Sequence, residues 1–249
     1  MLFKKYKYFS AVKPILKKKT MEKKKILVRD YIFSDGFLKQ KADDIVGSIQ
    51  RDSTEFATRG VTATTMTAFQ NSISSFDNTQ TDKELQGAVS VTTDAKNALA
   101  SNLKTAVSTV RTMAENKLGV TNGLYRSFGF EGMDEMPDEQ LYRLGKRVAR
   151  EATAQLANLA SEGLTAAIIT NLTSVNTSFD TAIDTQESAV KNRDIKTQER
   201  IEKGNVVYKE MVRLCNTGKN IWATVDEAKY NDYVIYNTPS GGPEAPPSV

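Results

Sequence analysis

Between Pro14 and Pro239 the chain contains only one proline, Pro137. A proline inside an α-helix removes a backbone hydrogen bond and clashes with the preceding turn. Its near-absence leaves more than 200 residues free to form long helices. Apolar residues in this stretch recur at steps of three and four, the spacing that places them on one face of a helix. We therefore expect an all-α fold, an elongated up-and-down bundle of long helices.

The first helical unit is expected over residues 26–118. Gly60 ends its first helix, and Thr62 caps the second. The regular spacing of apolar residues is interrupted just before Thr81. A break is therefore expected there, and Thr81 caps a third helix. That helix should run for about 36 residues to Gly119, or about 54 Å at about 1.5 Å per residue.

The second helical unit, expected over residues 137–222, repeats part of the first. Residues 57–77 match residues 160–180 at a constant offset of 103, with eight identities in 21 positions. We interpret this match as an internal duplication of a three-helix unit. Residues 165–217 fit either one continuous helix or two helices with a short bend. The identical pairs are Ala57/Ala160, Gly60/Gly163, Thr62/Thr165, Ala63/Ala166, Thr67/Thr170, Ser75/Ser178, Phe76/Phe179 and Asp77/Asp180.

The segments at the two ends of the helical body are rich in β-branched and aromatic residues. Residues 25–33 and 232–236 are therefore expected to be short strands. An even number of up-and-down helices would return the chain to its starting end, where the two strands could pair as a β-ribbon. If residues 165–217 form one helix, the number is odd and the two segments should lie at opposite ends of the rod.

The first 25 residues hold ten lysines and one glutamate, a net charge of +9 in a chain whose total is +4. The remainder is mildly acidic, so nucleic acid or an anionic membrane could be attracted only by these N-terminal lysines. Residues 1–25 are expected to be a basic, disordered leader, and residues 1–20 also fit an upstream extension, since Met21 opens a plausible start. At the other end, residues 223–249 are expected to form the terminal strand and a Pro-rich tail.

Targeting and membrane-spanning segments are not predicted. The apolar stretch after the first lysines ends at Lys13, which is too early for a signal peptide. No run reaches the ~18–20 apolar residues of a membrane span. We therefore expect a soluble chain, either cytoplasmic or associated with a virion.

Residues 119–136 form a crossover rich in glycine and aromatic residues between the two units. Loops of this length are often functional, and Trp and Tyr are favoured anchors at interfaces. The alternative is that these rings cap the ends of the bundle by packing on it. The candidate partner-binding residues, here and near the end of the chain, are Tyr125, Phe128, Phe130, Trp222, Tyr233 and Tyr236.

A basic strip lies in the helix that follows Pro137. Arg143, Arg147 and Arg150 share one side of that helix, where they could contact a phosphate or an acidic partner. The same charges also suit a solvated helix face.

The sequence contains no histidine. Ser-His-Asp and Cys-His nucleophilic sites, imidazole zinc sites and the Glu-x-x-His pairs of di-iron bundles are therefore excluded. The single cysteine, Cys215, lies at a core position of the stripe and is expected to be a buried apolar residue. No Gly-rich phosphate-binding loop is present. We therefore expect no cofactor, no metal site and no enzymatic activity.

Four motifs lie along the helical body: Gly60–Thr62 with Phe76, Gly163–Thr165 with Phe179, Arg193–Thr197 and Ala228–Tyr236. With these motifs the chain resembles a group of uncharacterised bacterial and phage-encoded proteins built from tandem long-helix units. The resemblance spans most of residues 30–238. It implies a helical-bundle fold and no particular site.

Taken together, these features favour a non-enzymatic structural, assembly or docking protein that acts through a protein partner or self-association. A component of a virion or of a cell-surface assembly is what the resemblance implies. The alternative function is a nucleic-acid-associated protein that uses the Lys-rich N-terminal arm.

Overall fold

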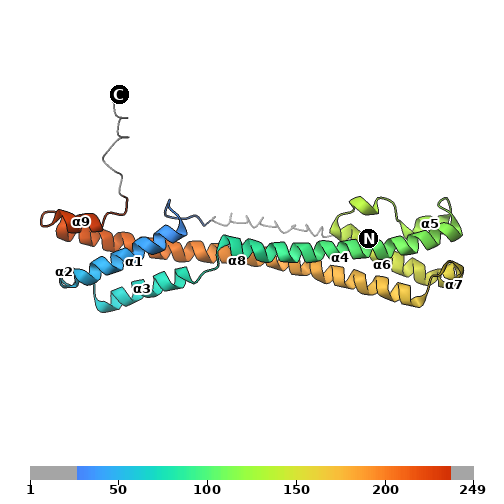
Figure 1. Cartoon of the computed structure of the whole chain (residues 1–249), viewed down its shortest axis with the longest axis horizontal. Coiled ribbons are helices and arrows are strands. Elements are labelled where there is room, and N and C mark those ends of the chain that lie inside the picture. Colours follow the sequence, from blue (N-terminus) through green and yellow to red (C-terminus); the bar gives the residue numbers. More distant parts are fainter. Residues whose placement is uncertain (1–26, 237–249) are drawn as a thin grey trace, which may run out of the picture.

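The computed structural model describes residues 27–236, which form a helical rod (Figure 1). Strands do not occur among these residues. None of the helices in this range combines the length and apolar character needed to cross a membrane. The elements are α1 (Asp35–Arg51), α2 (Ser53–Thr58), α3 (Ala63–Asp77), α4 (Asp82–Leu118), α5 (Gly123–Phe128), η1 (Met133–Glu135), α6 (Asp138–Ala154), α7 (Leu156–Leu159), η2 (Ala160–Glu162), α8 (Ala166–Trp222) and α9 (Glu227–Asp232).

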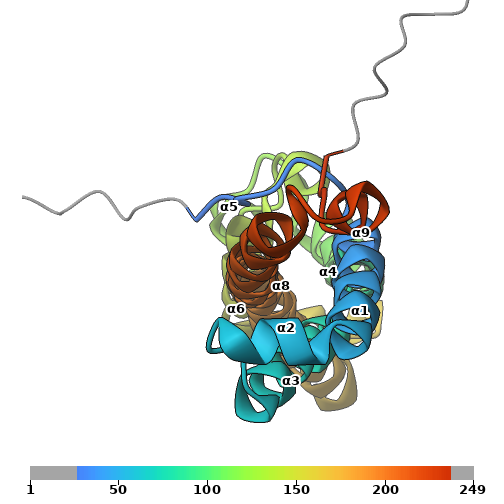
Figure 2. The same cartoon turned by 90° about the vertical axis from the view of Figure 1, so that its left-hand side faces the viewer.

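The longest helix, α8, runs from one end of the rod to the other (Figure 1). It has 57 residues, which corresponds to about 85 Å at about 1.5 Å per residue. The 37-residue α4 lies antiparallel along one half of it. Viewed along the rod, the remaining helices surround this pair (Figure 2).

Buried side chains form two separate clusters, one in each half of the rod. Lobe 1 consists of α1, α2, α3, the C-terminal part of α8, and α9. Lobe 2 consists of the C-terminal part of α4, then α5, α6 and α7, and the N-terminal part of α8. Between the lobes, no side chain is buried over residues 90–102 of α4 or residues 180–199 of α8.

Each lobe is built from both halves of the chain. In lobe 1 the α1–α3 hairpin shares its core with Val207 and Leu214 near the end of α8. In lobe 2 the hairpin of α6 and α8 shares its core with Leu103 and Val107 of α4. The C-terminal part of α4 therefore lies in lobe 2, beside the α6–α8 hairpin. The C-terminal part of α8 lies in lobe 1, beside the α1–α3 hairpin.

Helix boundaries repeat in the two halves at a nearly constant offset. α1 and α6 begin and end 103 residues apart, as do the starts of α3 and α8. α4 and α8 end 104 residues apart, and α5 and α9 begin and end 104 residues apart. The change of offset from 103 to 104 means that the second half of the chain has one additional residue. This residue lies where the first half has the turn between α3 and α4 and the second half continues as α8. The buried pairs at an offset of 103 are Leu38/Leu141, Ala42/Gly145, Ile45/Val148, Ile49/Ala152, Phe56/Leu159, Val61/Leu164, Phe69/Leu172, Ile73/Asn176 and Phe76/Phe179.

The predicted caps and glycine stops are confirmed, but the helices expected to run up to Gly60 and Gly163 are each interrupted, at Asp52 and at Gln155. The hydroxyls of Thr62 and Thr165 each accept a hydrogen bond from the backbone N–H three residues later, at 3.3 Å. Gly60 and Gly163 have φ angles of +79° and +93°, a region that glycine enters without a Cβ clash. The break before Thr81 is also confirmed, and Thr81 caps α4.

Replacing Gly60 or Gly163 with valine is expected to lower the free energy of unfolding by at least about 1 kcal/mol, because a β-branched residue is strained at positive φ. Gly87 of α4 is a matched control, since it is exposed and helical, and a methyl group added there would meet no atom within 4 Å. Gly87→Ala should instead stabilise the protein by about 0.5–1 kcal/mol. Urea denaturation followed by circular dichroism measures all three. Unchanged midpoints in both valine variants would contradict the helix-stop interpretation.

The predicted β-ribbon is wrong for the described residues. In the first segment the side-chain amide of Asn205 donates to Val28 O (2.8 Å) and accepts from the Asp30 N–H (2.9 Å). These are backbone groups that a neighbouring strand would otherwise satisfy. In the second segment α9 ends at Asp232, and turn-type hydrogen bonds continue to Val234. Residues 25 and 26 lie outside the described range.

Residues 166–222 form one continuous helix, which answers the question left open by the sequence. The two end segments nevertheless meet in lobe 1, where the ring centroids of Phe33 and Tyr236 are 5.9 Å apart. The expectation that a continuous helix would send them to opposite ends is wrong. It assumed helices of full length, whereas α1 and α3, with 17 and 15 residues, each cover less than half of the rod (Figure 1).

Candidate functional site

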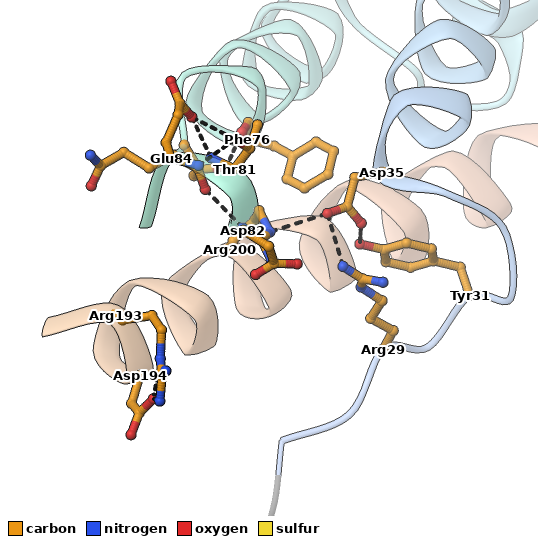
Figure 3. A network of polar contacts seen from close by, with 12 residues as sticks. Arg29, Tyr31, Asp35, Phe76, Thr81, Asp82, Glu84, Arg193, Asp194 and Arg200 are labelled. Carbon is orange, nitrogen blue, oxygen red and sulfur yellow. Dashed lines mark hydrogen bonds and ion pairs between the residues drawn. The ribbon is translucent and has the colours of Figure 1, made fainter. Parts of the chain in front are cut away.

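A network of charged side chains connects lobe 1 to the middle of α8 (Figure 3). Its centre is Arg200 of α8, whose side chain is 5% exposed. The guanidinium donates to the carbonyl oxygen of Gln80 (2.8 Å) and to the carboxylate of Asp82. Its Nε also lies 3.1 Å from Asp35 Oδ2. One arginine therefore holds the first residues of α1 and of α4 against α8.

Two residues that precede α1 complete this joint. The Tyr31 hydroxyl donates to Asp35 Oδ1 (2.8 Å), and Arg29 Nη2 lies 3.0 Å from Asp35 Oδ2. The Tyr31 ring fits because Gly204 of α8 has no side chain; a Cβ there would lie 2.4 Å from the hydroxyl oxygen. Burial and the bond to Asp35 raise the pKa of Tyr31. Within this network the carboxylates are paired with cations, an arrangement suited to holding helices together.

A simpler version of the joint occurs in lobe 2. Asp138, at the start of α6, lies 103 residues after Asp35, and Lys96 of α4 lies 104 residues before Arg200. Asp138 and Lys96 form an ion pair. The start of α1 is therefore held by a cation of α8, and the start of α6 by a cation of α4. Neither ion pair was predicted, because spacing along one helix does not show which helix lies beside it.

A second network surrounds the buried carboxylate of Asp52 at the break between α1 and α2. It accepts hydrogen bonds from Arg51 (2.8 and 2.9 Å) and from the Tyr233 hydroxyl (2.9 Å). Lys229 Nζ lies 3.3 Å away. The bonds from Arg51 hold the pKa of Asp52 well below its usual range, and burial raises the pKa of Tyr233. This network holds α9 against the outer part of lobe 1.

These shifts predict a wide pH range of constant stability. The bond from Arg200 lowers the pKa of Asp82, as Arg51 does for Asp52, so their stabilisation is present above the unfolded aspartate pKa of about 3.9 and is lost as the pH falls below it. Tyr31 and Tyr233 have raised pKa values, so their stabilisation is present below about pH 10 and is lost as the pH rises further.

With no histidine in the chain, the melting temperature should stay nearly constant between about pH 5 and pH 9 and fall on both sides. Calorimetry across this range measures it. A drop of several degrees between pH 6 and pH 8 would show that another titrating group controls the fold.

Five of the six aromatic residues proposed to bind a partner lie in the lobe cores. Tyr125, Phe128 and Phe130 pack in lobe 2, and Trp222 and Tyr233 pack in lobe 1. Burial removes these rings from the surface that a partner would touch. Their packing matches the alternative interpretation, in which they cap the ends of the bundle. The crossover that contains three of them forms α5 and η1.

Tyr236 is half exposed and lies among aromatic residues that were not identified from the sequence. Its ring centroid is 5.9 Å from that of Phe33, which in turn lies 4.9 Å from Phe37 and 5.9 Å from Tyr208. We name these four residues the aromatic patch. The sequence feature that could have indicated the patch was the density of aromatic residues between positions 31 and 37. We interpreted that density as a sign of a strand.

Arg143, Arg147 and Arg150 lie on the exposed face of α6, as their spacing predicts. None of the three forms an ion pair with another residue between 27 and 236. Positive charge at these positions is not required by the helical unit, because the equivalent residues of α1 are neutral or acidic. Those residues are Gln40, Asp44 and Gly47. Anion binding by the strip stays a prediction.

Cys215 is buried in lobe 1, and burial raises the pKa of its thiol to about 12. The thiolate is the reactive form of cysteine, so this thiol is unreactive at neutral pH. Over residues 27–236, aspartate, glutamate and cysteine side chains do not cluster in groups of three or more that could hold a metal ion.

No family model matches the chain, and no curated protein or solved structure matches it. Its function is therefore inferred from the fold and from the comparison of one half of the chain with the other.

Proposed function

We propose that the protein is a non-enzymatic scaffold, a rod that holds two docking ends at a set separation and acts through protein–protein contacts. The observation that carries this proposal is α8, a single helix of 57 residues that passes through both lobes. It spans about 85 Å at about 1.5 Å per residue. Bending a continuous helix sharply requires a break in its hydrogen-bond ladder, so α8 suits a spacer.

The relation between the two halves supports this function. Repeated helix boundaries and repeated buried positions support the inference that one helical unit was duplicated. Duplication of this kind produces a rod with two similar ends, which is what a connection between two partners requires. The resemblance to phage-encoded and bacterial long-helix proteins makes a virion or cell-surface assembly the setting we propose.

Exposed aliphatic side chains lie shortly after the ends of both long helices. Val120 and Leu124 follow α4 at the outer end of lobe 2, and Val225 follows α8 at the outer end of lobe 1. Single exposed apolar residues are common on protein surfaces. The support comes from their presence after both long helices.

Site-specific photocrosslinking in cells that express the full chain tests the scaffold proposal. A photoreactive residue is placed at Leu124 or Val225, with Asn97 on the exposed central part of α4 as the matched control. We expect protein adducts from both end positions and few from the control. Adducts at neither end, or equal yields at all three positions, would contradict a rod with docking ends.

A further inference from the structure

Charges on the exposed surface around α6 in lobe 2 are sorted by sign. α6 begins near the middle of the rod, where Asp138 pairs with Lys96, and runs towards α7 at the outer end (Figure 1). Acidic residues lie just before the helix and in its first turn, and basic residues follow along its exposed face. The acidic group is Glu131, Asp134, Glu135 and Glu139, and the basic group is Arg143, Lys146, Arg147 and Arg150.

Both groups lack partners of opposite charge within the described part of the chain. All eight residues are exposed, and none of them forms an ion pair with another residue between 27 and 236. Lys146 lies over the ring of Tyr142 on the same helix, 4.9 Å from its centroid, a contact that leaves its positive charge in place. These charges are therefore available to a partner.

The duplicated fold does not require this sorting of charges. At the equivalent positions of lobe 1, 103 residues earlier, no residue carries a charge of the same sign. The equivalents of the acidic group are Val28, Tyr31, Ile32 and Gly36, and those of the basic group are Gln40, Asp43, Asp44 and Gly47. Since lobe 1 forms its own core with these residues in place, the helical unit folds without the sorted charges. They belong to lobe 2 alone.

A partner that carries both signs fits this surface better than a polyanion does. Residues 27–236 contain 24 basic and 28 acidic side chains, so the described body as a whole repels nucleic acid. The acidic group, which lies next to the basic group, adds to that repulsion. A protein surface with the opposite signs in the same order satisfies both groups, because charges across an interface are complementary.

A second copy of the chain presents such a surface. When two copies are related by a two-fold axis, the same patch of each copy lies in the contact, and residue i of one copy faces residue j of the other. Antiparallel α6 helices then place the acidic group of each copy opposite the basic group of the other. The order of charges along α6, acidic first and basic last, is therefore self-complementary.

We propose that two copies of the chain form a two-fold symmetric dimer through this surface, with their α6 helices antiparallel. The acidic group of each copy pairs with the basic group of the other, so the ionic contact is made twice. The rods overlap at lobe 2 and extend in opposite directions, with a copy of lobe 1 at each far end. This dimer goes beyond the two docking ends proposed above, because its contact lies along the side of lobe 2.

Sedimentation velocity of the full chain tests the dimer. At about 0.1 mM protein the parent chain should sediment as a dimer in about 0.01 M salt and as a monomer in about 1 M salt. Between these conditions the screening length falls from about 30 Å to about 3 Å, which removes the attraction between exposed charges.

Two charge-reversed variants make the test specific. The acidic variant combines Arg143→Glu, Lys146→Glu and Arg150→Glu; Arg147 is kept because its guanidinium lies against Gly129. The basic variant combines Glu131→Lys, Glu135→Lys and Glu139→Lys. Each variant alone should be monomeric, because like charges then face each other, and an equal mixture should dimerise, because the charges are complementary again.

The matched control reverses three exposed basic residues outside lobe 2 and should dimerise like the parent chain. It combines Arg59→Glu, Lys83→Glu and Lys209→Glu.

Three results would overturn the proposal. The first is a parent chain that stays monomeric in low salt; loss of DNA-duplex binding in the acidic variant but not in the control would then make nucleic acid the partner. The second is an equal mixture of the two variants that stays monomeric, or dimerisation of either variant alone. The third is growth of the parent chain beyond a dimer, which would mean an open contact between two different surfaces.

Discussion

Replacing Tyr233 with alanine is expected to lower the free energy of unfolding by about 3–5 kcal/mol. The Tyr233 ring is fully buried in lobe 1 and packs on Gly218 of α8, where a Cβ would lie 2.4 Å from the ring. Removal of the ring leaves a cavity in this core. It also takes one hydrogen-bond donor from the buried carboxylate of Asp52, which adds to the loss.

Two further variants separate the contributions. Tyr233→Phe keeps the ring and removes the hydroxyl, and should lower the free energy of unfolding by about 1–2 kcal/mol. Tyr236→Ala removes a half-exposed ring three residues later and should change it by less than about 1 kcal/mol. Denaturant titration followed by circular dichroism measures all three. If Tyr233→Ala were no less stable than Tyr236→Ala, the segment after α8 would not belong to the lobe 1 core.

Arg200→Ala is expected to lower the free energy of unfolding by about 2–3 kcal/mol, near the lower end of the range for breaking a buried ion pair. The loss should not be larger, because the partner side chains of Asp35 and Asp82 are 27% and 67% exposed and water can solvate them. The variant also leaves the Gln80 carbonyl without its donor. The first turns of α1 and α4 should therefore exchange their amide hydrogens faster than in the parent chain.

Arg193→Ala, on the same helix, is the matched control. Arg193 pairs with its neighbour Asp194 and contacts no other helix through that pair, so its removal should change stability by less than about 0.5 kcal/mol. Hydrogen exchange followed by mass spectrometry, together with denaturant titration, compares the two variants. Equal losses, or unchanged exchange at α1 and α4 in Arg200→Ala, would contradict the role of Arg200 as the centre of the joint.

The helix boundaries marked by a capping threonine or a glycine stop could be predicted from the sequence because their causes are local, whereas the breaks at Asp52 and Gln155 were not predicted. A glycine that enters the left-handed region at Gly60 or Gly163 ends a helix whatever lies around it. A threonine such as Thr62 or Thr81 satisfies the free N–H groups of the helix that follows it. The burial of Cys215 could also be predicted, from its phase in the apolar stripe.

The pairing of the helices could not be predicted. An apolar stripe shows which face of a helix is buried, but it does not show which other helix packs on that face. Arg200 pairs with Asp82, 118 residues earlier, and only the fold brings the two together. The β-leaning segments failed as strands for a similar reason. A side chain at Asn205, 175 residues after Asp30, satisfies the backbone there. The aromatic patch was missed because its four rings come from three separate stretches of chain.

The C-terminal part of α8 completes lobe 1, which begins with α1. This arrangement has a consequence for synthesis on the ribosome. The α1–α3 hairpin emerges first, but its core requires Val207 and Tyr233, whereas lobe 2 requires nothing later than Ile183. The lobe that begins first therefore finishes last. At about 5–20 residues per second, the hairpin waits on the order of ten seconds for its partner helix. During that interval its apolar face is available to chaperones, and any chain that stops before α8 is complete lacks a folded N-terminal lobe.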